Sequence, residues 1–316
     1  MRPKVYIDGH VGTTGLRIRQ WLADRDDLEL LTLSDADRKN SEARREQALR
    51  SDVTVLCLPD DAAREVAAWT KDSEARLIDA STAHRVAEGW VYGLPELAPT
   101  QRDAIRSAKN VSNGGCYAAS FILLTRPLVD AGLLRSEAPL SIHALSGYTG
   151  GGKSLIEKWE GLENGYINLP YEAPYALERV HKHIPEMTAY SKLQHPPQFI
   201  PAVGPYACGM RVEIPLHAAL DIDSQQVWEA YQERYHDEPF VNVVPFQAEP
   251  ALNDFSLDPQ ACNDTNRIDL HVIPNREAGH TLLVAILDNL GKGASGMAIQ
   301  SLNLMLGVEE VMGLTA

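Results

Sequence analysis

Short apolar runs alternate with segments of helical apolar spacing along the first 115 residues. The runs predict buried strands and the spaced segments predict helices that pack on them. The expected strands are 4–8, 28–33, 52–58, 76–80 and 110–112, and the expected helices are 16–22, 62–69 and 102–107. Strands that alternate with helices are typical of a parallel sheet. We therefore predict an α/β fold whose residues 1–115 form a Rossmann-type, doubly wound domain.

The pattern changes after residue 116, where strands with alternating apolar and polar positions become prominent. They cover 140–146, 211–217, 268–273 and 281–287, with a helix expected over 227–235. Alternation of this kind predicts an α+β domain with a mixed or antiparallel sheet over residues 116–292. A last apolar helix, 297–306, follows a loop of small residues, so we expect 293–316 to complete the first domain. A chain of 316 residues suits two domains.

A glycine loop joins the first strand to the first helix. Gly9, Gly12 and Gly15 stand in a G-x-x-G-x-x-G spacing with Thr13 and Thr14 between them. The spacing differs from the usual G-x-G-x-x-G, but strand, glycine loop and helix form the context of a dinucleotide site. We expect these five residues to bind the cofactor.

The end of the second strand carries two conflicting signals for the cofactor. Asp35 comes 20 residues after Gly15, where an acid would hold a ribose hydroxyl and favour NAD. Ser34, Arg38 and Lys39 surround it and offer a clamp for the 2′-phosphate of NADP. We favour NADP; the alternative is a solvated charged loop.

Cys116 is the candidate nucleophile. It follows Gly114 and Gly115 and begins a segment of helical spacing. The glycines allow a sharp turn, and a helix start stabilises a thiolate, the nucleophilic form of cysteine. The alternative is a cysteine packed beneath the helix.

Polar side chains also follow the strand at 76–80. Ser81, Thr82 and Arg85 would lie at the carboxyl edge of the sheet, and their hydroxyl and guanidinium groups suit a phosphoryl group. A capping loop with a surface arginine is the alternative. Further along, His181 and His183 precede Pro185, which suits the first turn of a helix. An imidazole there suits proton transfer; a metal pair lacks a third ligand at convincing spacing.

Residues 147–154 read G-Y-T-G-G-G-K-S, a literal match to a phosphate-binding loop. No buried parallel strand is expected before it, and a dinucleotide loop already lies near the amino end. We interpret this segment as a mobile, glycine-rich loop near the active site.

Charge and composition narrow the function. The net charge of −14 argues against nucleic-acid binding and against anionic membranes, while a small anionic substrate remains compatible. The four cysteines show no disulfide or metal spacing, and no leader or apolar span of about 18 residues is evident. These features favour a cytoplasmic protein without a bound metal.

With these segments in view, the sequence resembles the N-acetyl-gamma-glutamyl-phosphate reductase family in its shorter form, within the aspartate-semialdehyde-dehydrogenase-like superfamily. The resemblance covers essentially the whole chain. It is most specific in residues 112–117, 146–152, 181–186 and 291–296.

The resemblance implies that Cys116 is the nucleophile and that His181 is the acid/base, with His183 second and Glu186 as an electrostatic partner. It also implies that the region of Asn289 flanks NADP, and it places Asn113 and Ser146 with the substrate. His10 and Thr13 depart from the residues usual in longer members.

The expected reaction is NADPH-dependent reduction of N-acetyl-gamma-glutamyl phosphate to N-acetylglutamate semialdehyde in arginine biosynthesis. Cys116 would form a thioester, and the expected assembly is a homodimer or homotetramer. Two alternatives stay open: a reductase of aspartyl or aminoadipyl phosphate, and an NADP-binding regulator without catalysis.

Overall fold

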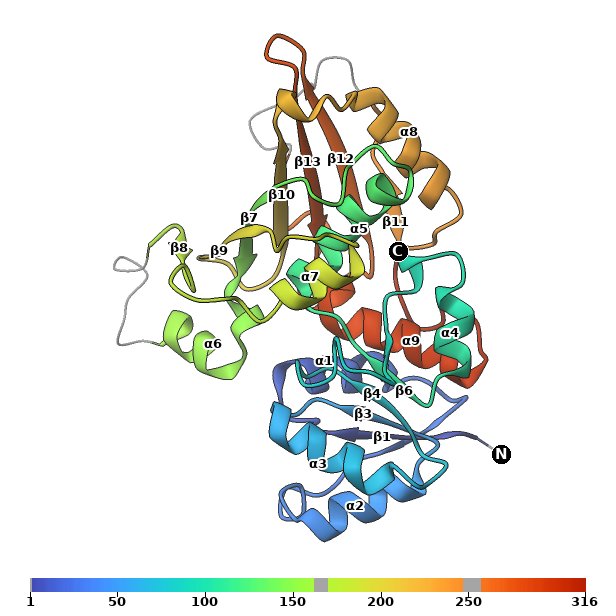
Figure 1. Cartoon of the computed structure of the whole chain (residues 1–316). Helices are drawn as coiled ribbons and strands as arrows, with labels where there is room; N and C mark the ends of the chain where they lie inside the picture. Colours follow the sequence, from blue (N-terminus) through green and yellow to red (C-terminus); the bar gives the residue numbers. More distant parts are fainter. Residues whose placement is uncertain (1, 162–169, 247–256) are drawn as a thin grey trace. The chain divides into compact units, whose positions relative to one another are not determined.

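The computed structural model describes residues 2–161, 170–246 and 257–316, which form two units (Figure 1). The first unit contains Met1–Gly114 and Ala294–Thr315, and the second contains Gly115–Gly293.

The first unit is built on a six-stranded sheet with the order β2-β1-β3-β4-β6-β5, in which every pair is parallel. Its elements are β1 (Lys4–Asp8), α1 (Thr13–Leu22), β2 (Glu29–Leu31), α2 (Ser41–Arg50), β3 (Val53–Leu56), α3 (Asp60–Thr70), β4 (Arg76–Asp79), β5 (Val91–Tyr92), α4 (Gln101–Ser107), β6 (Asn110–Ser112) and α9 (Gly296–Leu306). Because β2 and β3 lie on opposite sides of β1, the strand order reverses there. Such a switch point is where doubly wound sheets bind ligands.

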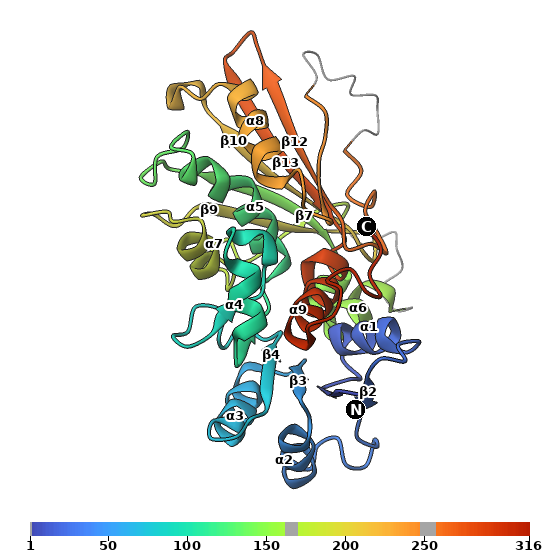
Figure 2. The ribbon, with the colours of Figure 1, turned by 90° about the vertical axis from the view of Figure 1, so that its right-hand side faces the viewer.

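Helices cover both faces of this sheet, with α1, α4 and α9 on one face and α2 and α3 on the other (Figure 2). Successive side chains of β1 point to opposite faces, so Val5 and Ile7 pack with Ile18, while Tyr6 packs with Ala48 and Val66. Each large apolar side chain buried in this way contributes about 1.5–3 kcal/mol.

The second unit is built on a seven-stranded mixed sheet with the order β11-β12-β13-β10-β7-β9-β8. Its pairs β7–β9 and β11–β12 are parallel and the others antiparallel. Its elements are α5 (Cys116–Asp130), β7 (Ser141–Gly147), a 3-10 turn (Tyr148–Gly151), α6 (Lys153–Glu160), β8 (Ala173–Pro174), α7 (Ile184–Tyr190), β9 (Gln198–Gly204), β10 (Met210–Leu216), α8 (Ser224–Tyr235), β11 (Val241–Val243), β12 (Ile268–Asn275) and β13 (His280–Leu287).

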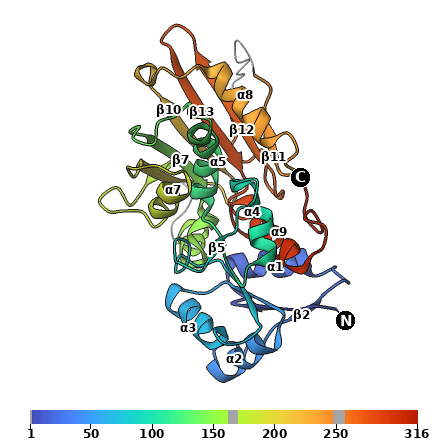
Figure 3. The same ribbon diagram turned by 45° about the vertical axis from the view of Figure 1, so that its right-hand side comes forward.

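One face of this sheet carries α5 and α8, and α7 packs beside α5 (Figure 3). On β10, Met210, Val212 and Ile214 are buried on this face, whereas Arg211 and Glu213 alternate onto the other. This second face carries a charged cluster. His143 Nδ1 lies 2.9 Å from Glu213 Oε2, and His143 Nε2 lies 3.1 Å from Glu172 Oε1.

The parallel sheet with helices and the mixed second sheet confirm the predicted fold class. The predicted strands recur with slightly different ends, and α1 begins three residues earlier than expected, at Thr13. Where a glycine loop was expected, Gly147 ends β7, Tyr148–Gly151 form the 3-10 turn and Gly152 caps α6. The sequence also gave no prediction for α2, α6 or β9.

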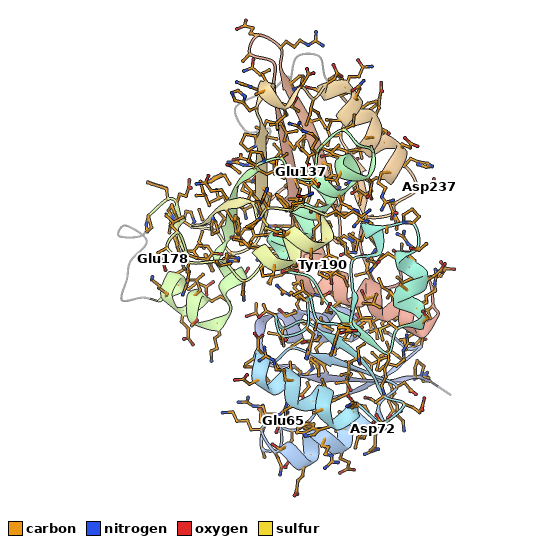
Figure 4. All side chains as sticks on the ribbon, viewed as in Figure 1. Glu65, Asp72, Glu137, Glu178, Tyr190 and Asp237 are labelled. Carbon is orange, nitrogen blue, oxygen red and sulfur yellow. The ribbon has the colours of Figure 1, made fainter. Side chains whose placement is uncertain are left out.

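Helix α2 shows why it escaped prediction. Only Arg44 and Ala48 are buried along it, so it has no apolar stripe. It is attached through an ion pair between Arg44 Nε and Asp8 Oδ2, 3.0 Å apart, with both side chains buried. Glu65 of α3, labelled in Figure 4, lies 3.5 Å from Arg44 Nη1. Burial raises the pKa of Asp8 despite the opposing charge of Arg44.

Candidate active site

Cys116 is the first residue of α5 in the second unit. Gly115 occupies the cap position, and no side chain caps this end of the helix. The amide groups of its first turn therefore have no partner within the helix and favour a negative charge or an oxyanion. Glu186, which is buried, accepts a hydrogen bond from the Gly115 amide at 3.1 Å and thereby joins α7 to the start of α5.

Two buried histidines precede α7. The backbone amide of His183 donates to His181 Nδ1 at 3.2 Å, so Nδ1 is an acceptor and the neutral ring carries its proton on Nε2. That Nε2 lies 3.4 Å from the hydroxyl oxygen of Tyr175. The two imidazole rings meet edge to face at a centroid distance of 4.7 Å, which fixes their orientation.

Two tyrosines complete this cluster. The Tyr175 hydroxyl donates to the Tyr117 hydroxyl at 3.4 Å, and Tyr117 also hydrogen-bonds with Ser146. Burial, with the nearby charge of Cys116, raises the pKa of Tyr175 to about 12. Burial, followed by the charges of Tyr175 and Cys116, raises the pKa of Tyr117. Both phenols therefore stay protonated at neutral pH.

Sequence reasoning assigned no role to these tyrosines. Tyr117 lies in segment 112–117, which carries part of the resemblance, and Tyr175 lies in a segment without periodicity. A third tyrosine, Tyr190 of α7, is labelled in Figure 4. Burial and the charge of Glu186 raise its pKa to about 12.

A π-helical turn, Gly291–Ser295, begins after β13, and Gly293 packs directly against Cys116. Asn289, just before it, was expected to flank the cofactor. Its amide nitrogen donates to the Thr149 hydroxyl at 3.1 Å, and its oxygen accepts from the Gly209 amide at 2.8 Å. Asn289 therefore fastens the turn after β7 within the second unit.

The glycine loop lies in the first unit, at the switch point beside β3. Gly9 has φ of +87°, and a Cβ there would lie 2.2 Å from the carbonyl oxygen of Cys57, so only glycine fits. A Cβ at Gly15 would lie 2.4 Å from the Gly9 oxygen. Gly12 caps α1 without a side-chain hydrogen bond, and Thr13 and Thr14 begin the helix. The open amide groups of this first turn fit a pyrophosphate.

The predicted 2′-phosphate clamp follows β2 in a turn. Ser34 donates to Asp37 Oδ2 at 2.7 Å, which orders the turn. Arg38 Nε lies 3.5 Å from Asp35 Oδ1, and the Lys39 side chain is exposed. The loop therefore presents cations at the surface, balanced loosely by Asp35.

The predicted phosphoryl-binding residues follow β4. The Ser81 hydroxyl donates to Asp79 at 2.8 Å and the Thr82 hydroxyl donates to Asp60 at 2.6 Å. Arg85, which is buried, donates through Nε to the carbonyl oxygen of Asn113 at 3.2 Å. Each of the two hydroxyl groups therefore already donates its hydrogen bond to a carboxylate of the same unit.

Asn113 ends the segment that leads from β6 to the cysteine. Its Nδ2 donates to the carbonyl oxygen of Ala294 at 3.0 Å, while its buried Oδ1 has no hydrogen-bond donor within the described residues. This oxygen is an acceptor that the amide of a bound ligand would satisfy.

The match to a phosphate-binding loop at 147–154 has a different role. The amides of Gly147, Tyr148 and Thr149 donate to backbone carbonyls of Gly209, Tyr206 and Ala207. In a phosphate-binding loop these groups would face the nucleotide. The segment is consequently part of the sheet connection.

Across 2–161, 170–246 and 257–316, no three His, Cys, Asp or Glu side chains are grouped closely enough to hold a metal ion. None of the helices in these ranges has the length and apolar character needed to cross a membrane.

The second unit thus brings together Cys116, His181, His183, Glu186 and Ser146, with Asn289 in the same unit. The first unit holds the remaining predicted residues. These are Gly9, Gly12, Thr13, Thr14, Gly15, Ser34, Arg38, Lys39, Ser81, Thr82, Arg85 and Asn113.

Comparison with known proteins gives both sequence and structural relatives. Residues 4–108 match the semialdehyde dehydrogenase NAD binding domain, and residues 116–289 match the semialdehyde dehydrogenase dimerisation domain. An N-acetyl-gamma-glutamyl-phosphate reductase 2 of a Nostoc species is 46% identical over 99% of both chains. Its Pseudomonas putida counterpart is 45% identical over 98% of this chain and 99% of the relative.

Solved structures share the fold at low identity. Aspartate semialdehyde dehydrogenase II of Vibrio cholerae superposes with a TM-score of 0.75 at 16% identity, covering 97% of this chain and 99% of that chain. The Candida albicans aspartate semialdehyde dehydrogenase with NADP gives 0.63 at 14% identity, covering 99% and 100%. Identity over nearly the full length with the reductases, and matches to both domain families, show that this chain belongs to the N-acetyl-gamma-glutamyl-phosphate reductase family of semialdehyde dehydrogenases.

Proposed function

We propose that this protein is an oxidoreductase that uses NADPH to reduce N-acetyl-gamma-glutamyl phosphate to N-acetylglutamate semialdehyde, a step of arginine biosynthesis. The observation that carries the proposal is Cys116 at the uncapped start of α5, in one unit with His181. The identity of the acyl chain is taken from the names of the full-length relatives.

The first half of the reaction is acyl transfer. The Cys116 thiolate attacks the acyl carbon, and the amides of the first turn of α5 stabilise the oxyanion that forms. The bond from the acyl carbon to the phosphoryl oxygen then breaks, and phosphate leaves with the electron pair. The product is a thioester on Cys116.

The second half reduces the thioester. NADPH, when bound, supplies a hydride to the carbonyl carbon. His181, whose neutral ring carries its proton on Nε2, donates a hydrogen bond from Nε2 to the hemithioacetal alkoxide that forms. The alkoxide then collapses to the carbonyl as the carbon–sulfur bond breaks and its electron pair returns to sulfur. The aldehyde is released and the thiolate is restored. Glu186, through its hydrogen bond from the Gly115 amide, keeps the start of α5 in place while the bond between sulfur and the acyl carbon forms and breaks.

The residues present fit NADP. Gly9 lies so close to the end of β3 that no side chain fits there, so the backbone of the glycine loop can approach a ligand closely. The start of α1, which has no side-chain cap, suits the pyrophosphate. Ser34, Arg38 and Lys39 would hold the 2′-phosphate. We assign cofactor binding to residues 1–115 with 293–316, and catalysis with dimerisation to 116–292.

A homodimer or homotetramer is the assembly we propose. The domain family matched by residues 116–289 is described as a dimerisation domain, and the face of the second sheet opposite α5 and α8 is suited to this use. Cysteines 57, 116, 208 and 262 are thiols that are not joined in disulfides, which suits a reducing, cytoplasmic setting.

Replacement of the nucleophile tests the function. Cys116→Ser should lower the NADPH-dependent reduction of N-acetyl-gamma-glutamyl phosphate by on the order of 10³-fold or more. Cys208→Ser, which changes another half-buried thiol, should leave the rate unchanged. Retention of most activity by Cys116→Ser would refute the mechanism.

Parallel assays with aspartyl and aminoadipyl phosphate test the substrate. A higher kcat/KM for either would replace the proposed acyl chain. NADP binding without turnover of any of the three acyl phosphates would support the alternative that the protein is an NADP-binding regulator without catalysis.

A further inference from the structure

The glycine loop contains a buried histidine that the proposed mechanism does not use. His10 lies between Gly9 and Gly12, and only 6% of it is exposed. A Cβ at Gly15 would lie 3.0 Å from the His10 Cα, so the backbone of His10 packs directly on the first turn of α1. Both the loop and the helix belong to the first unit.

The ring nitrogens of His10 are available. Among the residues that the structure describes, the His10 side chain makes no hydrogen bond, and neither ring nitrogen is one of the fully buried polar atoms that lack a partner. Both nitrogens therefore reach the small exposed part of the side chain. Because buried polar groups are almost always hydrogen-bonded, an imidazole in this state is suited to bind a ligand of the loop.

Asp8 is the charged group that acts on this ring. Both of its carboxylate oxygens accept from Arg44 Nε, at 3.2 and 3.0 Å, and Tyr6 also hydrogen-bonds with it. Glu65 lies on the other side of Arg44, 3.5 Å from Nη1. Burial raises the pKa of Asp8, and the charges of Arg44 and His10 oppose this effect. The carboxylate thus attracts a positive imidazole while its own hydrogen bonds go to other groups, so both N–H groups of a protonated ring stay available.

The first turn of α1 offers further donors to the same ligand. The amides of Thr13, Thr14 and Gly15 have no acceptor within the described part of the chain, and no acidic side chain stands in this turn. Open amides at a helix start favour a phosphate group. A protonated imidazole beside them adds a charge-assisted hydrogen bond, which is roughly twice as strong as a neutral one.

We propose that His10 binds a phosphate oxygen of the dinucleotide, and that protonation of its ring makes the protein bind the cofactor more tightly as the pH falls. Imidazole is the side-chain group that changes its charge between about pH 5 and 8. The glycine loop of this chain thereby adds a titratable donor to the fixed donors of its backbone. The proposal rests on the cofactor of the proposed function and does not depend on the acyl phosphate.

His10→Gln tests the proposal, because glutamine keeps a neutral N–H donor but cannot gain a charge. The dissociation constants of NADP and of NAD are measured by titration calorimetry on the full chain, at about pH 6 and about pH 8.5, on either side of the imidazole range. The ratio of variant to unchanged protein at each pH cancels the titration of the cofactor's own phosphate. His195→Gln, which changes an exposed histidine of the second unit, is the matched control.

We expect His10→Gln to weaken cofactor binding about tenfold at the lower pH and about twofold or less at the higher pH. His195→Gln should change neither constant. An equal loss for NAD and NADP would place His10 at the pyrophosphate, and a loss confined to NADP would place it at the 2′-phosphate; either result supports the proposal.

An equal loss at both pH values would show that His10 only fills space in the loop and would overturn the proposal. Unchanged affinity at the lower pH would do the same. If circular dichroism shows that His10→Gln is unfolded, the unchanged protein supplies the test through its proton uptake on NADP binding, measured near neutral pH in buffers of different ionisation enthalpy. Uptake of a fraction of a proton is expected, and no uptake would overturn the proposal.

Failure of the proposed function gives a different result. A protein that shows the predicted pH dependence of cofactor binding, yet reduces none of the three acyl phosphates, would contradict the proposed function and leave the role of His10 standing.

Discussion

Gly293→Ala tests whether the π-helical turn sets the position of the nucleophile. A Cβ at this residue would lie 2.6 Å from the Cys116 Cβ and 3.3 Å from its Cα. Carbon atoms in contact are about 3.5–4.0 Å apart, so one of the two backbones must move by roughly 1 Å. A misplacement of about 1 Å at a reacting group costs about 10²-fold in rate.

We therefore expect Gly293→Ala to lower kcat about 100-fold, equivalent to about 2.7 kcal/mol of activation free energy. Its affinity for NADP and its folded state, judged by circular dichroism, should be retained. Gly293 is not among the residues with positive φ, so alanine itself adopts this backbone without strain.

Gly132→Ala is the matched control. Gly132 has φ of +72° and nothing within 4 Å of the added Cβ, so alanine strains the backbone by about 1–2 kcal/mol without touching the sulfur. Its melting temperature should fall while its kcat stays constant. A Gly293→Ala enzyme with kcat within twofold of the unchanged protein would refute the role of the turn.

Three further predictions follow from the same geometry. Burial raises the pKa of the Cys57 thiol to about 12, so iodoacetamide at pH 7.5 should modify Cys116 well before Cys57, as followed by peptide mass spectrometry; equal rates would contradict this. Burial lowers the pKa of His143, but hydrogen bonds and charges of its two glutamates outweigh burial and raise it. Its stabilisation is therefore full below about pH 6.5 and is lost as pH rises through the folded pKa, so the free energies of unfolding at pH 6 and pH 8 should differ less in His143→Gln than in the unchanged protein, by at most about 1 kcal/mol. Arg44→Met should lower the free energy of unfolding in urea by about 3 kcal/mol because it leaves the Asp8 carboxylate buried without its cation, and Asp8→Asn in that background should recover part of the loss.

The sequence predicted those elements in which the order of apolar and polar residues shows which side chains are buried. Strands β1, β3 and β10 carry runs or alternations that any sheet of this class requires, and the glycine loop has no tolerance for side chains at Gly9. Helix α2 could not be found in this way, because only Ala48 joins the apolar core and the other buried side chain, Arg44, pairs with Asp8, 36 residues away, and with Glu65. Strand β9 contains Pro201, which breaks the usual signature of an interior strand.

The candidate site divides along the same line. Cys116 could be predicted as a functional residue because two glycines precede it and a helix begins at it. Tyr175 could not, because only the fold brings its hydroxyl group next to His181. The hydroxyls of Ser81 and Thr82 have the right chemistry for a phosphoryl group, but local sequence does not show that Asp79 and Asp60 already accept their hydrogens. Side-chain type predicts which reaction a site suits, and only the fold shows which donors remain for the ligand.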